Sequence, residues 1–187
     1  MAAIPSAGPD SAGRFTLITM TGPLAVAAAG GLIDELSELA AAAFSGPPWH
    51  ETPVQARQLT GRMLAEARHP GFVLAFAFAG HGPALAGFGY GLPRRPGDHV
   101  AGTLLTFHGE PFEFCELAVR PAMRGQGAGR ALHDAIVAES GPQPRWLVTH
   151  PAARPAVSLY RASGWHTRRL FPSRVDGSTR LLMARPS

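Results

Sequence analysis

The segment at residues 112–130, FEFCELAVRPAMRGQGAGR, constrains the fold of this chain most strongly. Its first eight residues read as a strand. Pro121 turns the chain, and three closely spaced glycines then lead into a helix that we expect from about Ala128 to Glu139. The start of such a helix carries unpaired backbone N–H groups and partial positive charge.

This Gly-rich turn is suited to hold a phosphate or a pyrophosphate. Glycines let a bulky anion approach the N–H groups closely, and Arg124 and Arg130 can add charge-assisted hydrogen bonds. A P-loop would need Lys and then Ser or Thr after Gly129, where this chain has Arg130 and Ala131. A dinucleotide fingerprint would need a third glycine where Arg130 stands. The alternative to a phosphate-binding turn is a tight strand-to-helix connection that binds no ligand.

Hydrophobic patterns along the rest of the chain predict a mixed α/β fold. We expect strands at 14–20, 72–79, 84–91, 112–119, 145–150, 165–171 and 178–184, and helices at 30–44, 53–68, 128–139 and 153–163. Helices that interrupt strands in this way indicate one mixed sheet. We expect a flexible leader at 1–13 and a single domain over 14–187.

The composition excludes several classes of protein and site. The single Cys115 excludes an internal disulfide and a zinc site built from cysteines, and the eight histidines show no metal spacing. The sequence contains no run of 18 apolar residues, so we expect no membrane span. Its first residues lack the basic start and apolar core of a signal peptide, so we expect a cytoplasmic protein. All 17 basic residues are arginines, scattered among 13 acidic residues with a net charge of +4. This balance predicts a solvated surface, with neither nucleic acid nor membrane as a partner.

Two sequence blocks resemble the GNAT N-acetyltransferase superfamily. Residues 124–129, RGQGAG, match the family's acyl-CoA motif Q/R-x-x-G-x-G/A. Residues 156–165, AVSLYRASGW, are similar to its A-x-x-L-Y-x-x-x-G-F block. A helix and a strand separate the two blocks, as the family requires, and the resemblance covers roughly residues 14–184.

The resemblance implies the GNAT fold, a mostly antiparallel sheet of six to seven strands flanked by about four helices. It also implies transfer of an acyl group, most simply acetyl from acetyl-CoA, to an amine, without a metal. We expect a small-molecule acceptor. A protein or peptide N-acetyltransferase and a non-catalytic acyl-CoA-binding sensor are the alternatives. GNAT domains often dimerise, so a homodimer is also possible.

The same resemblance assigns the CoA-binding residues. The backbone of Leu117, Ala118 and Val119 would pair with the pantetheine arm as an added strand does. The turn Arg124, Gly125, Gln126, Gly127, Ala128, Gly129 and Arg130 would hold the pyrophosphate. Ala153 stands where the family often has an asparagine that contacts the CoA arm, so this chain lacks that side-chain hydrogen bond.

Three residues are candidates for proton transfer. By the resemblance, Tyr160 lies near the thioester sulfur and protonates the leaving thiolate, which suits a phenol of ordinary pKa near 10. Glu113 and Glu116 are candidates for the base that deprotonates the amine, and we favour Glu116 because it is nearer the pantetheine strand. Desolvation in an apolar strand would raise the pKa of either carboxyl. The alternatives are carboxylates that face solvent or pair with arginine, and a Tyr160 hydroxyl at the surface.

The acceptor pocket is expected in the loop FSGPPWHE at 44–51. Trp49 offers a flat surface for an amine, and Glu51 offers a counter-charge. The alternative is a proline-stiffened loop that packs its tryptophan onto the core. Residues 93–111, with Asp98, His99, His108 and Glu110, are expected to form a mobile loop that can cover the cleft. Cys115 we interpret as a small core residue and not as a nucleophile.

Overall fold

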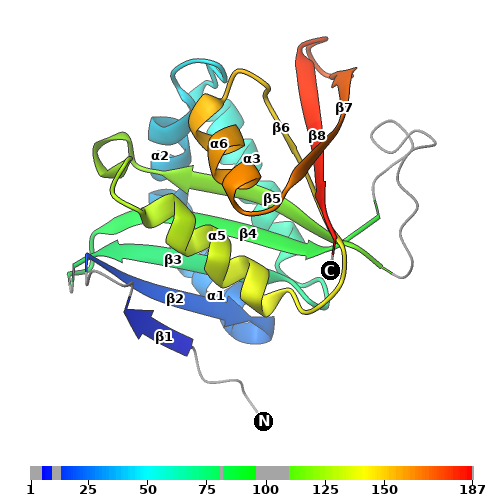
Figure 1. Cartoon of the computed structure of the whole chain (residues 1–187). Helices are drawn as coiled ribbons and strands as arrows, with labels where there is room; N and C mark the ends of the chain where they lie inside the picture. The colour runs from blue at the N-terminus through cyan, green and yellow to red at the C-terminus, as the bar shows by residue number, and fades with distance from the viewer. Residues whose placement is uncertain (1–5, 10–13, 81, 96–109, 187) are drawn as a thin grey trace. The chain divides into compact units, whose positions relative to one another are not determined.

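The computed structural model describes residues 6–9, 14–80, 82–95 and 110–186. The chain divides into two compact units, one of Met1–Leu92 with Glu116–Gly141, the other of Pro93–Cys115 with Pro142–Ser187. Strand β5 (Phe112–Val119) runs through both (Figure 1). The single domain expected over 14–187 stays a prediction.

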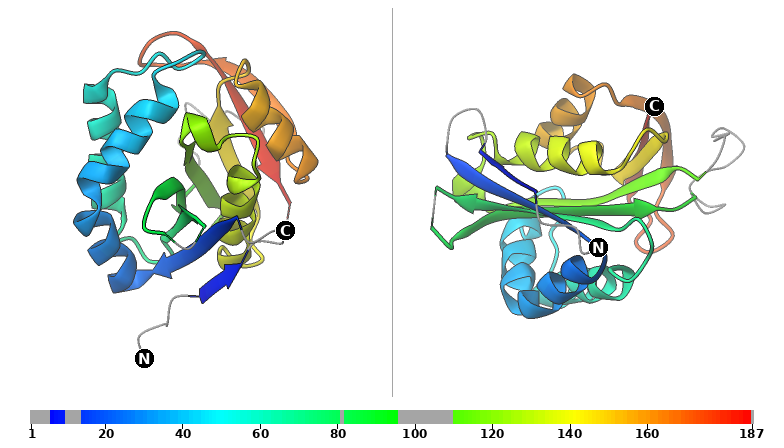
Figure 2. Two further views of the ribbon diagram at one scale, coloured as in Figure 1. Left: turned by 90° about the vertical axis from the view of Figure 1, so that its left-hand side faces the viewer. Right: turned by 90° about the horizontal axis from the view of Figure 1, so that it is seen from below.

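The first unit is a largely antiparallel sheet with helices on both faces. It contains β1 (Ser6–Pro9), β2 (Phe15–Thr21), α1 (Gly22–Gly31), α2 (Ile33–Phe44), α3 (Pro53–Glu66), β3 (Val73–Ala79), β4 (Leu85–Pro93), the second half of β5 and α5 (Ala128–Glu139). The strand order is β1-β2-β3-β4-β5, and the first four strands pair antiparallel. Helices α1, α2 and α3 cover one face of this sheet, and α5 covers the other (Figure 2).

Local sequence explains these elements. The apolar run VLAFAFA forms β3, whose first five residues are buried. Helix α2 buries Leu36 and Leu39 on one face, as the helical spacing predicts. Helix α3 begins with a capping box in which Thr52 and Gln55 satisfy each other's backbone N–H groups, followed by a proline in its first turn.

Close packing in the first unit depends on glycine in β4. A Cβ atom added to Gly89 would lie 2.9 Å from the Glu116 carbonyl oxygen and 2.9 Å from Ile136 Cδ1. Only a residue without a side chain therefore lets β5 and α5 approach β4 this closely. These two elements flank the Gly-rich turn, so this packing fixes both ends of the turn.

The second unit is a smaller sheet with one helix. It contains the first half of β5, β6 (Arg145–Thr149), α6 (Arg154–Ala162), β7 (His166–Pro172) and β8 (Thr179–Arg185), in the strand order β5-β6-β8-β7. Strands β6, β8 and β7 pair antiparallel, whereas β5 and β6 pair in parallel through Phe112↔Arg145 and Glu113↔Trp146. Trp146, Phe171 and Leu182 form a buried cluster in this unit.

The fold class expected from the sequence is confirmed, and the helix expected at 128–139 has those bounds. One α-helix and one strand were not expected. Helix α1 has a glycine- and alanine-rich sequence without an amphipathic pattern, and it buries only the small side chains of Ala25 and Ala29. Strand β1 pairs with β2 inside the segment expected to be a flexible leader. Residues 96–109, with Asp98, His99 and His108 of the expected lid, lie outside the described residues.

Candidate functional site

The Gly-rich turn has the geometry of an anion cradle. After a short 3-10 helix, η2 (Pro121–Met123), Gly125 has φ 74° and Gly127 has φ 99°, a region that favours glycine. Gly127 is the N-cap of α5 and provides no side-chain cap. The first bond of the helix runs from the Ala131 N–H to the Gly127 carbonyl at 3.0 Å. The N–H groups of Ala128 and Gly129 therefore point out of the helix start, where an anion can accept from them.

Side chains brace the turn from within the first unit. Arg124 donates from Nη2 to the Ala43 carbonyl at 2.6 Å and from Nε to the Val119 carbonyl at 3.4 Å. Gln126 donates from Nε2 to the Ala122 carbonyl at 3.0 Å. Both side chains thus donate to backbone carbonyls, and neither caps the N-terminus of α5.

The expected pantetheine strand is the end of β5. Ala118 is fully buried, and a Cβ atom at Gly87 would lie 2.7 Å from its carbonyl oxygen and 3.3 Å from Val119 Cγ2. The parallel ladder with β6 involves residues 112 and 113. Residues 117–119 thus lie farther along β5 than the part paired with β6, as strand addition by an extended ligand requires.

Tyr160 lies in an aromatic cluster of the second unit. Its ring centroid is 6.0 Å from that of Phe114 and 5.9 Å from that of Trp165, and Tyr160 is 6% exposed. Most of the Tyr160 side chain is therefore buried, and its role as proton donor stays a prediction. Ala153 is the N-cap of α6 and is 5% exposed, so this helix also begins without a side-chain cap.

Glu116 forms an ion pair with α3. Its Oε1 lies 3.2 Å from Arg62 Nη2, and its side chain is 21% exposed. Burial lowers the pKa of Arg62, but the charges of Tyr90 and Glu116 and a hydrogen bond with Tyr90 outweigh it, so the pKa is raised. Arg62 therefore stays cationic beside the Glu116 carboxylate.

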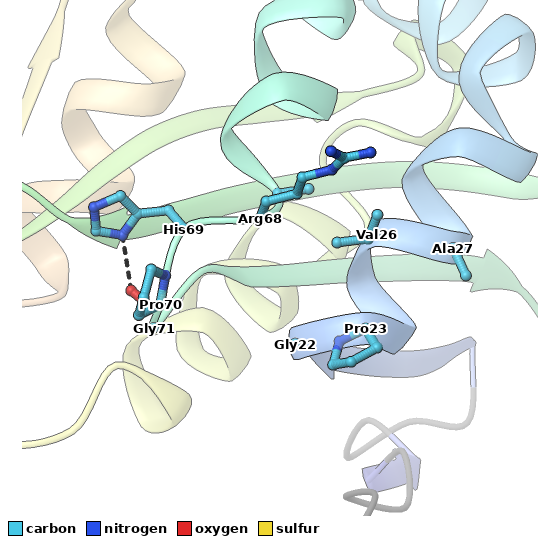
Figure 3. Close-up of a pocket in the computed structure, with 9 residues that line it drawn as sticks. Gly22, Pro23, Val26, Ala27, Arg68, His69, Pro70 and Gly71 are labelled. Atoms are coloured by element: carbon cyan, nitrogen blue, oxygen red, sulfur yellow. Dashed lines mark hydrogen bonds between the residues drawn. The ribbon is translucent and has the colours of Figure 1, made fainter.

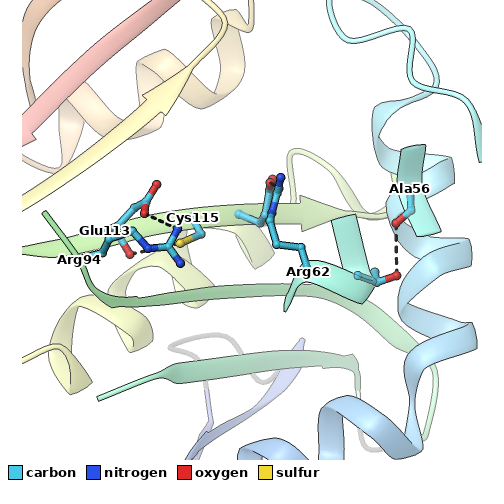
Figure 4. A network of polar contacts seen from close by, with 7 residues as sticks. Ala56, Arg62, Arg94, Glu113 and Cys115 are labelled. Atoms are coloured by element: carbon cyan, nitrogen blue, oxygen red, sulfur yellow. Dashed lines mark hydrogen bonds and ion pairs between the residues drawn. The ribbon is translucent and has the colours of Figure 1, made fainter. Parts of the chain in front are cut away.

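Glu113 has a similar partner in the second unit. Its Oε2 lies 3.0 Å from Arg94 Nη1, and its side chain is 17% exposed (Figure 4). Cys115 Sγ lies 3.7 Å from the Glu113 carbonyl oxygen and is half-buried. Both candidate bases thus pair with arginine, which is the alternative that the sequence left open.

The expected acceptor loop follows α2 directly. Trp49 packs edge-on against Phe44, with ring centroids 5.8 Å apart. The Glu51 N–H donates to the Phe44 carbonyl at 2.9 Å, which closes the loop. Trp49 and Glu51 are half-buried, so the tryptophan contributes to packing and keeps part of its surface accessible.

The two units thus divide the expected residues. The first holds Glu116, the end of β5, the Gly-rich turn and the acceptor loop; the second holds Glu113, Ala153 and Tyr160. The sequence did not indicate Arg62 or Arg94 as partners of the two glutamates, because neither arginine stands in a motif. It also gave no sign that Arg124 contacts α2.

A surface hollow of about 470 Å³ lies elsewhere in the first unit (Figure 3). The start of α1, including Gly22 and Val26, lines it together with Arg68 and His69 after α3. None of the expected site residues lines it, so it is separate from the candidate site.

Two kinds of feature are not found. Among the described residues, no group of three or more His, Cys, Asp or Glu side chains could hold a metal ion. No helix in the part of the chain that the structure describes is long and apolar enough to span a membrane.

Solved structures share the fold over nearly the whole chain. One is a histone acetyltransferase HPA2 and related acetyltransferase from Corynebacterium glutamicum, with 19% identity, a TM-score of 0.63, and 97% of this chain and 96% of that chain covered. A putative GNAT-family acetyltransferase from Bordetella pertussis has 16% identity, a TM-score of 0.64, and coverages of 96% and 98%. The ribosomal-protein-S18-alanine N-acetyltransferase from Escherichia coli has 16% identity, a TM-score of 0.60, and coverages of 92% and 93%.

Sequence comparison gives the family. No curated protein matches the chain significantly. The family model of the GNAT acetyltransferases matches residues 33–165, which include the Gly-rich turn and the Tyr160 block. The chain therefore belongs to the acetyltransferase (GNAT) family.

Proposed function

We propose that the protein transfers an acetyl group from acetyl-CoA to the primary amine of a small molecule. The family supports acetyl transfer from acetyl-CoA. The observation that carries the proposal is the start of α5, where two positive-φ glycines and an uncapped helix N-terminus form a cradle for a pyrophosphate. The proposal includes no metal, nucleic acid or membrane partner and places the reaction in the cytoplasm.

Binding of the acetyl donor is assigned to the first unit. The N–H groups of the turn at 125–130 would donate hydrogen bonds to the pyrophosphate, and the backbone of 117–119 would pair with the pantetheine arm. Arg124 has five N–H donors, of which the contacts with Ala43 and Val119 use two, so others can reach a phosphate. The chain has no lysine, so backbone N–H groups and arginines supply all the positive charge of this site.

Proton transfer is assigned to Tyr160 and a glutamate. When the amine nitrogen forms its bond to the acetyl carbon, the carbon–sulfur bond breaks and the thiolate needs a proton, which Tyr160 would donate. The amine loses a proton to a base, for which Glu116 is the first candidate and Glu113 the second. In its ionised form the Glu116 carboxylate, paired with Arg62, can accept a proton directly or through water.

The acceptor is assigned to the loop after α2. The exposed part of Trp49 can stack against an ammonium or an apolar ring, and Glu51 can attract a cation. Peptide amines are the second acceptor class. Structures of similar fold include the ribosomal-protein-S18-alanine N-acetyltransferase and the NatC complex bound to Gag peptide and CoA.

A thiol-release screen tests the proposal. The purified chain is incubated with acetyl-CoA and panels of small amines, aminoglycosides, amino acids and peptides, and released CoA is measured. Acceptor-dependent release with a small amine is the expected result, and mass spectrometry of the product identifies the acetylated nitrogen. Release with peptides alone would replace the small-molecule acceptor by the peptide class. Binding of acetyl-CoA without release on any panel would favour a non-catalytic sensor.

A further inference from the structure

One hydrogen bond joins two segments to which the proposed function gives different tasks. Arg124 Nη2 donates to the carbonyl of Ala43, 81 residues earlier in the chain, at 2.6 Å. Arg124 opens the turn proposed to hold the pyrophosphate. Ala43 lies in the last turn of α2, immediately before the loop proposed to hold the acceptor. Both segments belong to the first unit, so the contact lies within one compact body.

Arg124 completes the C-terminal end of α2. The last carbonyls of a helix need partners from outside it. The Ala41 carbonyl accepts from the Ser45 N–H at 3.1 Å and the Phe44 carbonyl from the Glu51 N–H at 2.9 Å. The last turn of α2 contains no basic residue, so Arg124 supplies the positive charge that this end of the helix favours.

The acceptor loop is attached to the same end of α2. Phe44 contacts Trp49 through its ring and Glu51 through its carbonyl. Ala43 and Phe44 are 6% and 8% exposed, so packing limits their freedom to move independently. If the motion of Ala43 is restricted, the motion of Trp49 and Glu51, the two residues proposed to contact the acceptor, is therefore restricted as well.

We propose that Arg124 couples occupancy of the Gly-rich turn to the order of the acceptor loop at 44–51. This inference rests on the proposed function, because CoA is the anion that occupies the turn. A pyrophosphate on the turn restricts the Arg124 guanidinium, and the bond to Ala43 transmits the restriction to the end of α2. Arg124 is thus a positioning residue for the acceptor as well as a contact for the donor.

Hydrogen–deuterium exchange tests the coupling with CoA itself as the probe. In the unsubstituted chain, saturating CoA slows the exchange of the peptide that contains residues 44–51. Arg124→Gln places an amide nitrogen where Arg124 has Nε, so it can keep the contact with Val119 and loses the atom that reaches Ala43. We expect this variant to bind CoA and to lose the CoA-induced protection of 44–51. Arg124→Met, which has no hydrogen-bond donor, gives the same loss.

Arg130→Gln is the matched control. It removes the same charge from the first turn of α5 and leaves the bond between Arg124 and Ala43 in place. We expect weaker CoA binding with the protection of 44–51 retained at saturation. A second readout is the CoA-induced change in Trp49 fluorescence, measured as the difference between each chain and its Trp49→Phe counterpart.

The outcomes separate the inference from the proposed function. If the unsubstituted chain does not bind CoA, the proposed function is wrong, and the coupling with it. If the unsubstituted chain and Arg124→Gln bind CoA and protect 44–51 equally, the coupling alone is wrong. If Arg130→Gln also loses the protection at saturation, the effect belongs to the charge of the turn and not to the contact with Ala43, which overturns the inference.

Discussion

At the scale of single residues, the proton donor can be tested by removing one oxygen atom. Tyr160→Phe keeps the ring that packs against Phe114 and Trp165 and deletes the hydroxyl. If the hydroxyl protonates the thiolate, kcat falls by about 10²-fold or more. The dissociation constant of CoA and the melting temperature should change little, because the buried contacts of the ring remain. Full activity in steady-state thiol release would exclude Tyr160 as the acid.

The two candidate bases can be separated by the same chemical change at each position. We expect Glu116→Gln to lower kcat by about 10²-fold or more and Glu113→Gln to lower it less. The activity of the unsubstituted enzyme should fall as the pH decreases and Glu116 takes up a proton. This acid limb should disappear in Glu116→Gln and persist in Glu113→Gln.

The alkaline side of this pH–activity profile depends on whether Arg62 keeps its positive charge. Burial lowers the pKa of Arg62, but the interactions with Tyr90 and Glu116 raise it by more than burial lowers it, so the net shift is upward. A cation with a raised pKa keeps its charge throughout the neutral and moderately alkaline range. The pair of Arg62 and Glu116 therefore breaks on the acid side alone. A larger effect of Glu113→Gln on the acid limb would reverse our assignment.

Single residues also show where sequence reasoning stops. Arg124, Gly127 and Tyr160 stand in motifs, so their elements and spacing could be predicted. The partners of Glu113 and Glu116 could not, because Arg94 and Arg62 lie 19 and 54 positions away in the chain, outside any motif. An ion pair between distant segments depends on which helix packs over which strand, and periodicity does not specify this.

At the scale of elements, the start of α5 depends on the backbone of one glycine. Gly127 has φ 99°, and an added Cβ would meet no atom within 4 Å, so the cost of a side chain there lies in the backbone conformation. We expect Gly127→Ala to destabilise the protein by about 1 kcal/mol and to weaken CoA binding, because the N–H groups of the turn shift. Calorimetry and CoA titration measure the two effects.

Gly61→Ala is the control for this change. Gly61 lies inside α3, where an added Cβ also meets no atom within 4 Å and φ is not positive. The same methyl group should stabilise the protein there by about 0.5–1 kcal/mol, because alanine favours the helix. Destabilisation of equal size at both positions would show that the conformation of Gly127 is not the cause.

Elements with a strong pattern could be predicted, and those without one could not. Strand β5 and helix α5 have the bounds expected from the sequence. Helix α1 was missed because GPLAVAAAGG contains the residues that normally mark a turn, and its stability comes from packing small side chains against the sheet. Strand β1 was missed because four residues, SAGP, carry no alternation. Its pairing with β2 is a tertiary effect.

At the scale of the whole molecule, the absence of lysine limits where the acetyl group can go. Every one of the 17 basic residues is an arginine, so the only primary amine of the 187-residue chain is its N-terminus. We expect prolonged incubation with acetyl-CoA to add at most one hydroxylamine-resistant acetyl group per chain, because esters and thioesters are cleaved by hydroxylamine. Intact-mass spectrometry measures the number of groups added.

A variant with one lysine calibrates this measurement and makes the acceptor screen decisive. Arg68 is exposed and lies outside the proposed site, so Arg68→Lys adds an amine without a change in formal charge. This variant should accept a second resistant acetyl group under alkaline conditions, whereas the unsubstituted chain should not. A second resistant group on the unsubstituted chain would show that a group other than an amine accepts the acetyl. If the unsubstituted chain takes up at most one resistant acetyl group, any further acetyl released from acetyl-CoA must have gone to the added acceptor or to water. The mass of the product distinguishes an acetylated acceptor from acetate.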